Sequence, residues 1–283
     1  MKAIFLLLTL IPFFSFAQSM QPKTPDDVVE QIKKHVTCDW MSKTVDVYKA
    51  GDPQTSLKGI AVCMFADMPT LEKAVELGCN FIITHEPVFY SHLDGTDNLQ
   101  DDPVFLAKKE FIEKNKLVIF RFHDHIHMTE PDGIYVGMIN QMELQSSSVN
   151  GSMTHYQLPR QSVKEYARTL KKQLGLETVR VIGNPNMEFT KMGLAVGAPG
   201  GQSHIQLLRQ PDVEVLVAGE GPEWETYSYV NDAVSQGKNK AVIFVGHVKS
   251  EEAGMKYCAE WLKGFLAEVP IHFIENVPNF STL

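Results

Sequence analysis

Short apolar runs rich in Val, Ile and Phe alternate along the chain with stretches of about 10 to 15 residues that have the apolar spacing of helices. This alternation is typical of βαβ units and predicts an α/β fold with mainly parallel sheets flanked by helices. In the first half, we predict strands at 59–65, 81–84 and 117–122 and helices at 24–36, 69–77 and 102–115. In the second half, we predict strands near 178–182 and 193–197 and at 213–218, 241–245 and 271–274, with helices at 162–174, near 224–236 and from Ser250 onward.

Residues 145–152 have the most linker-like composition after the amino-terminal segment, and they lie near the middle of the chain. Their Ser, Asn and Gly residues favour a connection over a helix or a strand. We therefore expect two α/β lobes, formed by residues 18–148 and residues 149–283.

The first 17 residues have the organisation of an export signal. Lys2 is followed by an apolar run from Ala3 to Phe16, and Ser15-Phe16-Ala17 has the pattern of a small-residue cleavage site. This run is shorter than the roughly 20 apolar residues that a membrane span requires, and no later stretch approaches that length. We expect residues 1–17 to be a signal peptide, and the mature protein to be periplasmic or secreted without a stable membrane span.

The composition is that of a globular protein. Apolar residues make up 44% of the chain, with 19 Gly and 15 Pro, which excludes disorder, collagen and coiled coil. The formal net charge of −8 becomes −9 when Lys2 is removed with the signal peptide, and this acidic balance argues against a nucleic-acid partner. The four cysteines permit disulfides in an oxidising compartment, but they include no Cys-x-x-Cys pair and their spacing requires none.

Three predicted strands end in segments that contain histidine. These segments are His85-Glu86 after strand 81–84, His123-Asp124-His125-Ile126-His127 after strand 117–122, and Gly246-His247 after strand 241–245. Ligands of open α/β sheets bind in the crevice beyond the carboxyl ends of the strands. We therefore expect the three segments to converge. A single histidine after a strand is more often a surface or hydrogen-bonded residue, so the hypothesis depends on all three together.

Imidazoles and carboxylates gathered at one place suit a divalent transition metal such as Zn, Mn, Fe, Co or Ni, and the lack of Cys among them argues against a structural thiolate site. His247 and Glu251 are four residues apart, so both side chains can meet one ion from the same face of a helix. In the segment 123–127, an extended backbone would direct positions 123, 125 and 127 to one side, whereas a turn would change that selection.

Weaker candidates follow other strands. Glu220 comes after strand 213–218 and is a candidate general base, a partner of a metal ligand, or a solvated loop acid. The glycine-rich loop 197–201 precedes a helix near Gln202, where its amides could hold an anion or simply form a tight turn. The histidines without a partner pattern are interpreted as structural or surface residues: His35, His92, His155, His204 and His272.

At the first two histidine segments, the sequence resembles the Nif-three-like dinuclear-metal family, also called the GTP cyclohydrolase I type 2 homologues. The segment Gly78–Pro87 looks like the family's strand followed by His-His-Pro, with Glu86 in place of the second histidine. The segment His123–His127 occupies the place of the family's His-Thr-Asn-Leu-Asp, with His127 in place of the aspartate.

The resemblance extends over most of the mature chain. Gly246–Glu251 matches the family's Gly-His-x-x-Ser-Glu, and Val217–Glu220 resembles its Thr-Gly-Glu stretch. A histidine that often follows that stretch is missing here, and Trp224 is nearby instead.

By resemblance, the fold would be two α/β lobes with a pair of metal ions between them, and the chain would form a homo-oligomer, as family members assemble into toroidal hexamers. The two departures compensate in charge, because the family's one Asp and one Glu become Glu86 and Glu251. The metal ligands that this comparison implies are His85, Glu86, His123, His127, His247 and Glu251.

The leading hypothesis is a metal-dependent hydrolase in which two divalent ions polarise a carbonyl, amidine or phosphoryl group and lower the pKa of a bridging water. Glu220 would be the general base, and His123 either a ligand or a proton carrier. The family label suggests GTP ring opening, but an exported protein would rarely meet GTP, so a peptide, phosphoester or cyclic amide is as plausible a substrate. The alternatives are a non-catalytic metal-binding or carrier protein and an interaction scaffold.

Overall fold

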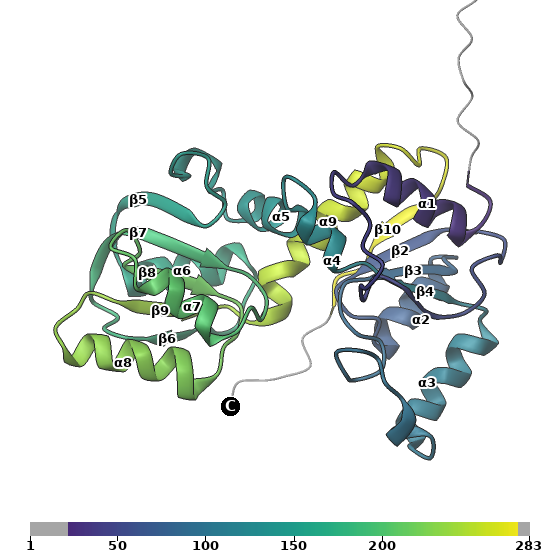
Figure 1. The fold of residues 1–283 in the computed structure, drawn as a ribbon, viewed down its shortest axis with the longest axis horizontal. Helices are drawn as coiled ribbons and strands as arrows, with labels where there is room; N and C mark the ends of the chain where they lie inside the picture. The colour runs from purple at the N-terminus through teal and green to yellow at the C-terminus, as the bar shows by residue number, and fades with distance from the viewer. Residues whose placement is uncertain (1–21, 277–283) are drawn as a thin grey trace, which may run out of the picture.

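Two five-stranded sheets, each flanked by helices, form two lobes that lie side by side (Figure 1). The computed structural model describes residues 22–276, so the predicted signal peptide lies outside the described residues. The expected α/β class and the arrangement in two lobes are confirmed.

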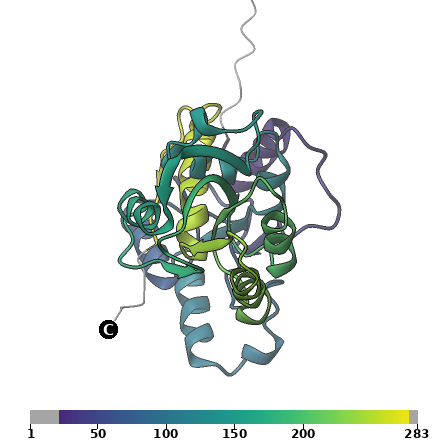
Figure 2. The same cartoon turned by 90° about the vertical axis from the view of Figure 1, so that its left-hand side faces the viewer.

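The first lobe is built on a mainly parallel sheet. Its strand order is β1 (Tyr48–Ala50), β4 (Val118–Arg121), β3 (Phe81–Thr84), β2 (Ile60–Cys63) and β10 (Ile271–Phe273). The edge strand β1 runs antiparallel to β4, and the other pairs are parallel. Every residue of β2, β3 and β4 is buried, because helices and connections cover both faces of the sheet. The flanking helices are α1 (Pro25–His35), α2 (Met68–Glu76) and α3 (Pro103–Lys114), of which α3 projects beyond the rest of the lobe in both views (Figures 1 and 2).

The second lobe has a parallel centre with an antiparallel strand at each edge. Its strand order is β5 (His155–Ser162), β7 (Glu188–Ala195), β8 (Val215–Ala218), β9 (Ala241–Phe244) and β6 (Arg180–Ile182). The pairs of β7 with β8 and of β8 with β9 are parallel, whereas β5 and β6 run antiparallel to their neighbours. Its helices are α6 (Val163–Gln173), α7 (Gly201–Leu208), the π-helix Glu223–Tyr227 and α8 (Ser228–Ser235).

Two helices cross where the lobes meet (Figure 1). They are α5 (Gly133–Gln141) and α9 (His247–Lys263), and the short helix α4 (Asp124–Met128) precedes them on the side of the first lobe. Gly137 of α5 lies so close to the backbone of α9 that a Cβ there would overlap Ala253 and Gly254. After α9 the chain returns to the first sheet through β10, so the expected boundary at residue 148 separates β1–β4 from β5–β9 but leaves β10 in the sheet of the first lobe.

The sequence pattern located every predicted element of the first lobe to within two residues, and it was less accurate in the second. Strand β7 begins at Glu188, and α9 begins at His247 instead of Ser250. The helix expected near 224–236 is divided into a π-helix and α8. The elements β1, β5, α4 and α5 were not predicted. Helix α5 has no clear apolar stripe because it is nearly continuously apolar, as a helix enclosed between other elements can be.

We expect Gly137→Ala to destabilise the protein by about 1–3 kcal/mol, because the added methyl group would force α5 and α9 apart. Alanine is otherwise the better helix former, so intrinsic propensity acts in the opposite direction. Urea unfolding of the purified protein measures this effect. Gly95→Ala is the control, since the nearest atom to a Cβ there is 3.9 Å away; equal stability of the two variants would contradict the close crossing.

Candidate metal centre

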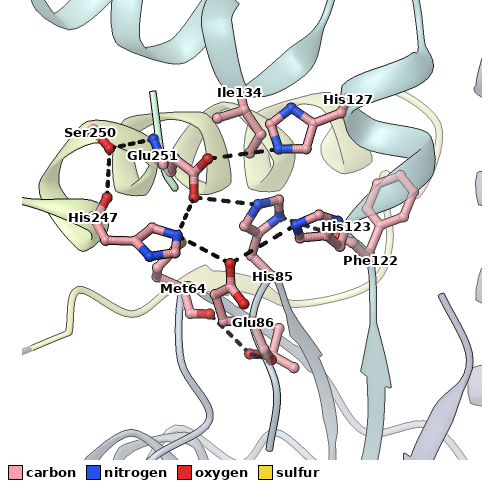
Figure 3. A network of polar contacts seen from close by, with 12 residues as sticks. Met64, His85, Glu86, Phe122, His123, His127, Ile134, His247, Ser250 and Glu251 are labelled. Carbon is pink, nitrogen blue, oxygen red and sulfur yellow. Dashed lines mark hydrogen bonds and ion pairs between the residues drawn. The ribbon is translucent and has the colours of Figure 1, made fainter. Parts of the chain in front are cut away.

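Six side chains from both lobes point toward one another where the lobes meet (Figure 3). They are the six ligands that the sequence implied: His85 and Glu86 directly after β3, His123 and His127 at the start of α4 and on it, and His247 and Glu251 on α9. The three histidine segments therefore converge as expected beyond the carboxyl ends of strands. Two of the strands, β3 and β4, are neighbours in the first sheet, and β9 belongs to the second.

The segment 123–127 makes a helical turn, not an extended strand. His123 and His127 are therefore four residues apart on one helical face, and their ring centroids are 5.3 Å apart. His125 points elsewhere, since it is fully buried, stacks on Trp40 at a centroid distance of 3.7 Å and lies 2.6 Å from Asp46 through Nδ1. The turn thus selects two of the three histidines for the site.

His85 shows most clearly which ring nitrogen faces the centre of this group. Its Nδ1 lies 3.2 Å from the Phe122 carbonyl oxygen, which can only accept, so Nδ1 carries the proton and Nε2 carries a lone pair. Nε2 is buried and has no hydrogen-bond partner, although Glu251 Oε2 lies 3.6 Å away. Burial, with the neighbouring His127 and His123, lowers the pKa of His85 well below its usual value, so the ring stays neutral. A buried lone pair facing a carboxylate is unfavourable unless a cation lies between them.

The other three histidines are oriented in the same way. The Nδ1 atom of each lies next to a carboxylate oxygen: Asp124 at 3.0 Å for His123, Asp132 at 3.0 Å for His127, and Glu220 at 3.2 Å for His247. Metal-ligating histidines almost always donate their second ring N–H to a carboxylate or carbonyl group. All four Nε2 atoms are thereby left to face Glu86 and Glu251 (Figure 3).

The two carboxylates lie among these Nε2 atoms. Glu251 Oε2 is 3.0 Å from His247 Nε2, and Glu251 Oε1 is 3.8 Å from His127 Nε2. Glu86 Oε1 is 3.2 Å from His247 Nε2 and 3.9 Å from His123 Nε2. Two ligands that are each about 2.0–2.2 Å from one ion are at most about 4.4 Å apart, so these separations suit shared coordination.

His247 holds the two carboxylates together by charge. Burial would lower the pKa of His247, but hydrogen bonds to Glu251 and Glu86 outweigh that effect and raise the pKa to about 10. For Glu86, burial would raise the pKa, but the hydrogen bond from His247 and the nearby positive groups lower it. In the absence of a metal ion, a proton on His247 therefore supplies the positive charge that these carboxylates require.

Asp46 is a supporting residue that sequence reasoning missed. Its Oδ1 accepts hydrogen bonds from the backbone N–H groups of His123 at 2.7 Å and Asp124 at 2.8 Å, and its Oδ2 accepts one from the N–H of His125 at 2.9 Å. A carboxylate at the positive end of a helix is favourable, and here it fixes the turn that carries the two candidate ligands His123 and His127. No local sequence signal marks this role, because Asp46 caps a helix 77 residues away.

Glu220, the loop 197–201 and His92 lie at or near the six converging side chains. Glu220 is half exposed at the rim, where it contacts His247 Nδ1. In the loop 197–201, Gly197 lies against the Glu251 carboxylate and Gly201 against Glu225, which favours the tight-turn interpretation over an anion site. Of the histidines set aside, His92 lies beside the site, with its ring centroid 6.5 Å from that of His123.

The four cysteines are unpaired, and Cys63, Cys79 and Cys258 are buried. Within residues 22–276, no helix combines the length and apolar character that crossing a membrane would require.

A profile of the Duf34/NIF3 (NGG1p interacting factor 3) family matches residues 24–279. The chain belongs to this family. The Duf34/NIF3 assignment confirms the resemblance noted in the histidine motifs, and it covers both lobes and all six converging side chains.

Individual relatives are consistent with the assignment of this chain to the Duf34/NIF3 family. A Clostridium acetobutylicum protein named GTP cyclohydrolase 1 type 2 homolog is 23% identical over 233 residues, which cover 78% of this chain and 82% of that protein. The crystal structure of a Bacillus cereus protein related to NIF3 has a TM-score of 0.73 at 13% identity and covers 94% of this chain and 100% of its own. A Staphylococcus aureus hypothetical protein has a TM-score of 0.71 at 15% identity, with 93% and 100% covered. These structures share the fold of this chain.

The raised pKa of His247 predicts a pH-dependent stability of the metal-free protein. Protonated His247 is stabilised only in the folded state, so its contribution is complete below pH 6.5 and is lost as pH rises toward about 10. In chelator-treated samples, we expect the stability advantage of wild type over His247→Gln to shrink between pH 7 and pH 10. Denaturant unfolding at several pH values measures it, and an advantage that does not change with pH would contradict the ion-paired network.

Proposed function

We propose that the chain binds two divalent transition-metal ions between its lobes and acts as a metal-dependent hydrolase. The observation that carries the metal proposal is the buried, unpartnered Nε2 of neutral His85, which faces the Glu251 carboxylate. Four imidazoles and two carboxylates are a donor set that suits Zn, Mn, Fe, Co or Ni. The Nδ1 contacts of all four histidines support it, since they fix the rings with Nε2 toward the centre.

When bound, two such ions would polarise a carbonyl, amidine or phosphoryl group and lower the pKa of a water molecule. The chain's own residues would divide the remaining work. Buried His85 and Glu251 exclude water from the inner side of the site. His123, with a quarter of its side chain exposed, is either the fourth imidazole ligand or a proton carrier between the site and solvent. Glu220, 3.2 Å from His247 Nδ1, would orient that ring, and its half-exposed carboxylate is the proposed base.

The proposed substrate class rests on the expected export of the chain more than on the name of a relative. The Clostridium protein is named as a homolog of GTP cyclohydrolase 1 type 2, and an exported protein would rarely meet GTP. We therefore propose a peptide, phosphoester or cyclic amide. Non-catalytic metal carriage is the second candidate, because six side chains, with His85 and Glu251 buried among them, can close the coordination of two ions.

Metal content tests the centre directly. We expect residues 18–283 to hold about two ions per chain by plasma mass spectrometry, and His85→Ala and His247→Ala each to lose at least one. His35→Ala is the matched control, because His35 stacks on Phe265 and is not one of the converging residues. Full metal content in both site variants would show that the assignment is wrong.

Hydrolysis is tested separately on the metal-loaded protein with panels of peptides, phosphoesters and cyclic amides. Turnover that disappears in His247→Ala and persists in His35→Ala would support the enzyme. Two tightly held ions with no turnover on any of the three panels would favour metal carriage.

We further propose that residues 1–17 are removed on export to the periplasm or the exterior, and that the mature chain forms a homo-oligomer, as the family resemblance implies. Amino-terminal sequencing of protein from the native host should begin at Gln18. Light scattering of the same sample gives its mass. A cytoplasmic protein that retains Met1 would contradict the proposed location.

A further inference from the structure

Arg121 is a fully buried cation directly behind the six converging side chains. It is the last residue of β4, two positions before His123, and its side chain has no solvent exposure. The guanidinium Nε donates to the His85 carbonyl oxygen at 3.0 Å, and Nη1 donates to the His92 carbonyl oxygen at 2.5 Å. Its Nη2 donates to Glu86 Oε2 at 3.3 Å. One planar group therefore holds the pair His85-Glu86 at two points and the backbone of His92 at a third.

The two oxygens of Glu86 consequently have different partners. Oε2 is turned back toward Arg121, and Oε1 faces Nε2 of His247 and of His123. Nine-tenths of the Glu86 side chain is buried, so water cannot substitute freely for either partner. A carboxylate that is held by one oxygen in this way has its other oxygen free to turn toward an ion.

We propose that Arg121 is the positioning residue that makes Glu86 a one-oxygen metal ligand and confines its contribution to one of the two ions. The inference rests on the proposed metal centre. Glu86 stands close to a second buried carboxylate, Glu251, with His247 between them. A fixed positive charge on the outer side of Glu86 offsets the repulsion between the two acids without occupying the space between them.

The geometry requires arginine at this position. The guanidinium directs separate N–H groups at three acceptors in one plane, whereas a lysine ammonium is a single point charge. Loss of Arg121 would free Oε2 and release the backbone at His85 and His92 together. The His85 ring keeps its own contact with the Phe122 carbonyl oxygen, whereas the Glu86 carboxylate loses the donor that orients it. The effect on metal binding should therefore pass through Glu86 and spare the ion that does not contact it.

A double-mutant cycle with Co²⁺ tests this role. The chain from residue 18 is stripped of metal and titrated with Co²⁺ by calorimetry and visible absorption, for wild type, Arg121→Met, Glu86→Gln and the double variant. Lys49→Met is the matched control, because Lys49 lies on the neighbouring edge strand β1, forms a buried ion pair with Asp94, 3.1 Å away, and is not one of the six converging residues. Unfolding in urea is recorded for each variant.

We expect Arg121→Met to weaken one Co²⁺ equivalent about 10- to 100-fold, which is the usual effect of removing a partner of a metal ligand, and to leave the other equivalent unchanged. The absorption band of the weakened ion should shift as its coordination changes. In the Glu86→Gln background, Arg121→Met should have no further effect. Lys49→Met should retain both affinities and the wild-type spectrum.

Wild-type affinities in Arg121→Met, or an equal loss with and without Glu86, would overturn the role of Arg121 and leave the metal centre standing. A wild-type protein that takes up no Co²⁺ would overturn the metal centre and this inference with it. If Arg121→Met does not fold, the same titration is carried out on Arg121→Lys, which keeps the buried positive charge but lacks the planar guanidinium. A weakened ion in that variant supports the proposal, and two wild-type affinities overturn it.

Discussion

At the junction of the two lobes, a neutral, buried imidazole faces a buried carboxylate, and the surrounding residues are arranged around this pair. His85 comes from the first sheet and Glu251 from a helix that follows the second, so neither lobe contains the pair alone. The Phe122 carbonyl fixes the proton of His85 on Nδ1, which leaves the lone pair of Nε2 directed at Glu251. Lone pairs that face each other in a water-poor interior are stabilised by a cation between them, and the surrounding donors are of the kind that could hold a metal ion.

The rest of the fold places these two side chains. The glycine contact between α5 and α9 lets the helix backbones approach closely, and this sets the position of Glu251 relative to the first lobe. Asp46 fixes the turn of α4, so that His123 and His127 share a face while His125 packs on Trp40. Carboxylates outside the centre then orient three of the four rings. Polar contacts that are far apart in sequence thus converge on a small group of Nε2 atoms.

Much of the fold was predictable because buried parallel strands are short, apolar and regularly spaced, as in β2, β3 and β4. The six converging residues were predictable because each follows such a strand, or lies one helical turn from a residue that does. Other features depend on tertiary contacts that leave no local pattern. The choice of His123 and His127 over His125 depends on Asp46, and the orientation of Glu86 depends on Arg121. The return of β10 to the first sheet likewise depends on pairing with a strand some 200 residues earlier in the chain.

X-ray absorption spectroscopy of the metal-loaded protein, in wild type and in His85→Ala, tests the proposed metal centre most directly. We expect a coordination shell of nitrogen and oxygen at about 2.0–2.2 Å with imidazole scattering and no sulfur, a second metal at about 3.5–4 Å, and a reduced imidazole contribution in the variant. A sulfur-containing shell, or an imidazole signal that His85→Ala leaves unchanged, would contradict the proposed centre.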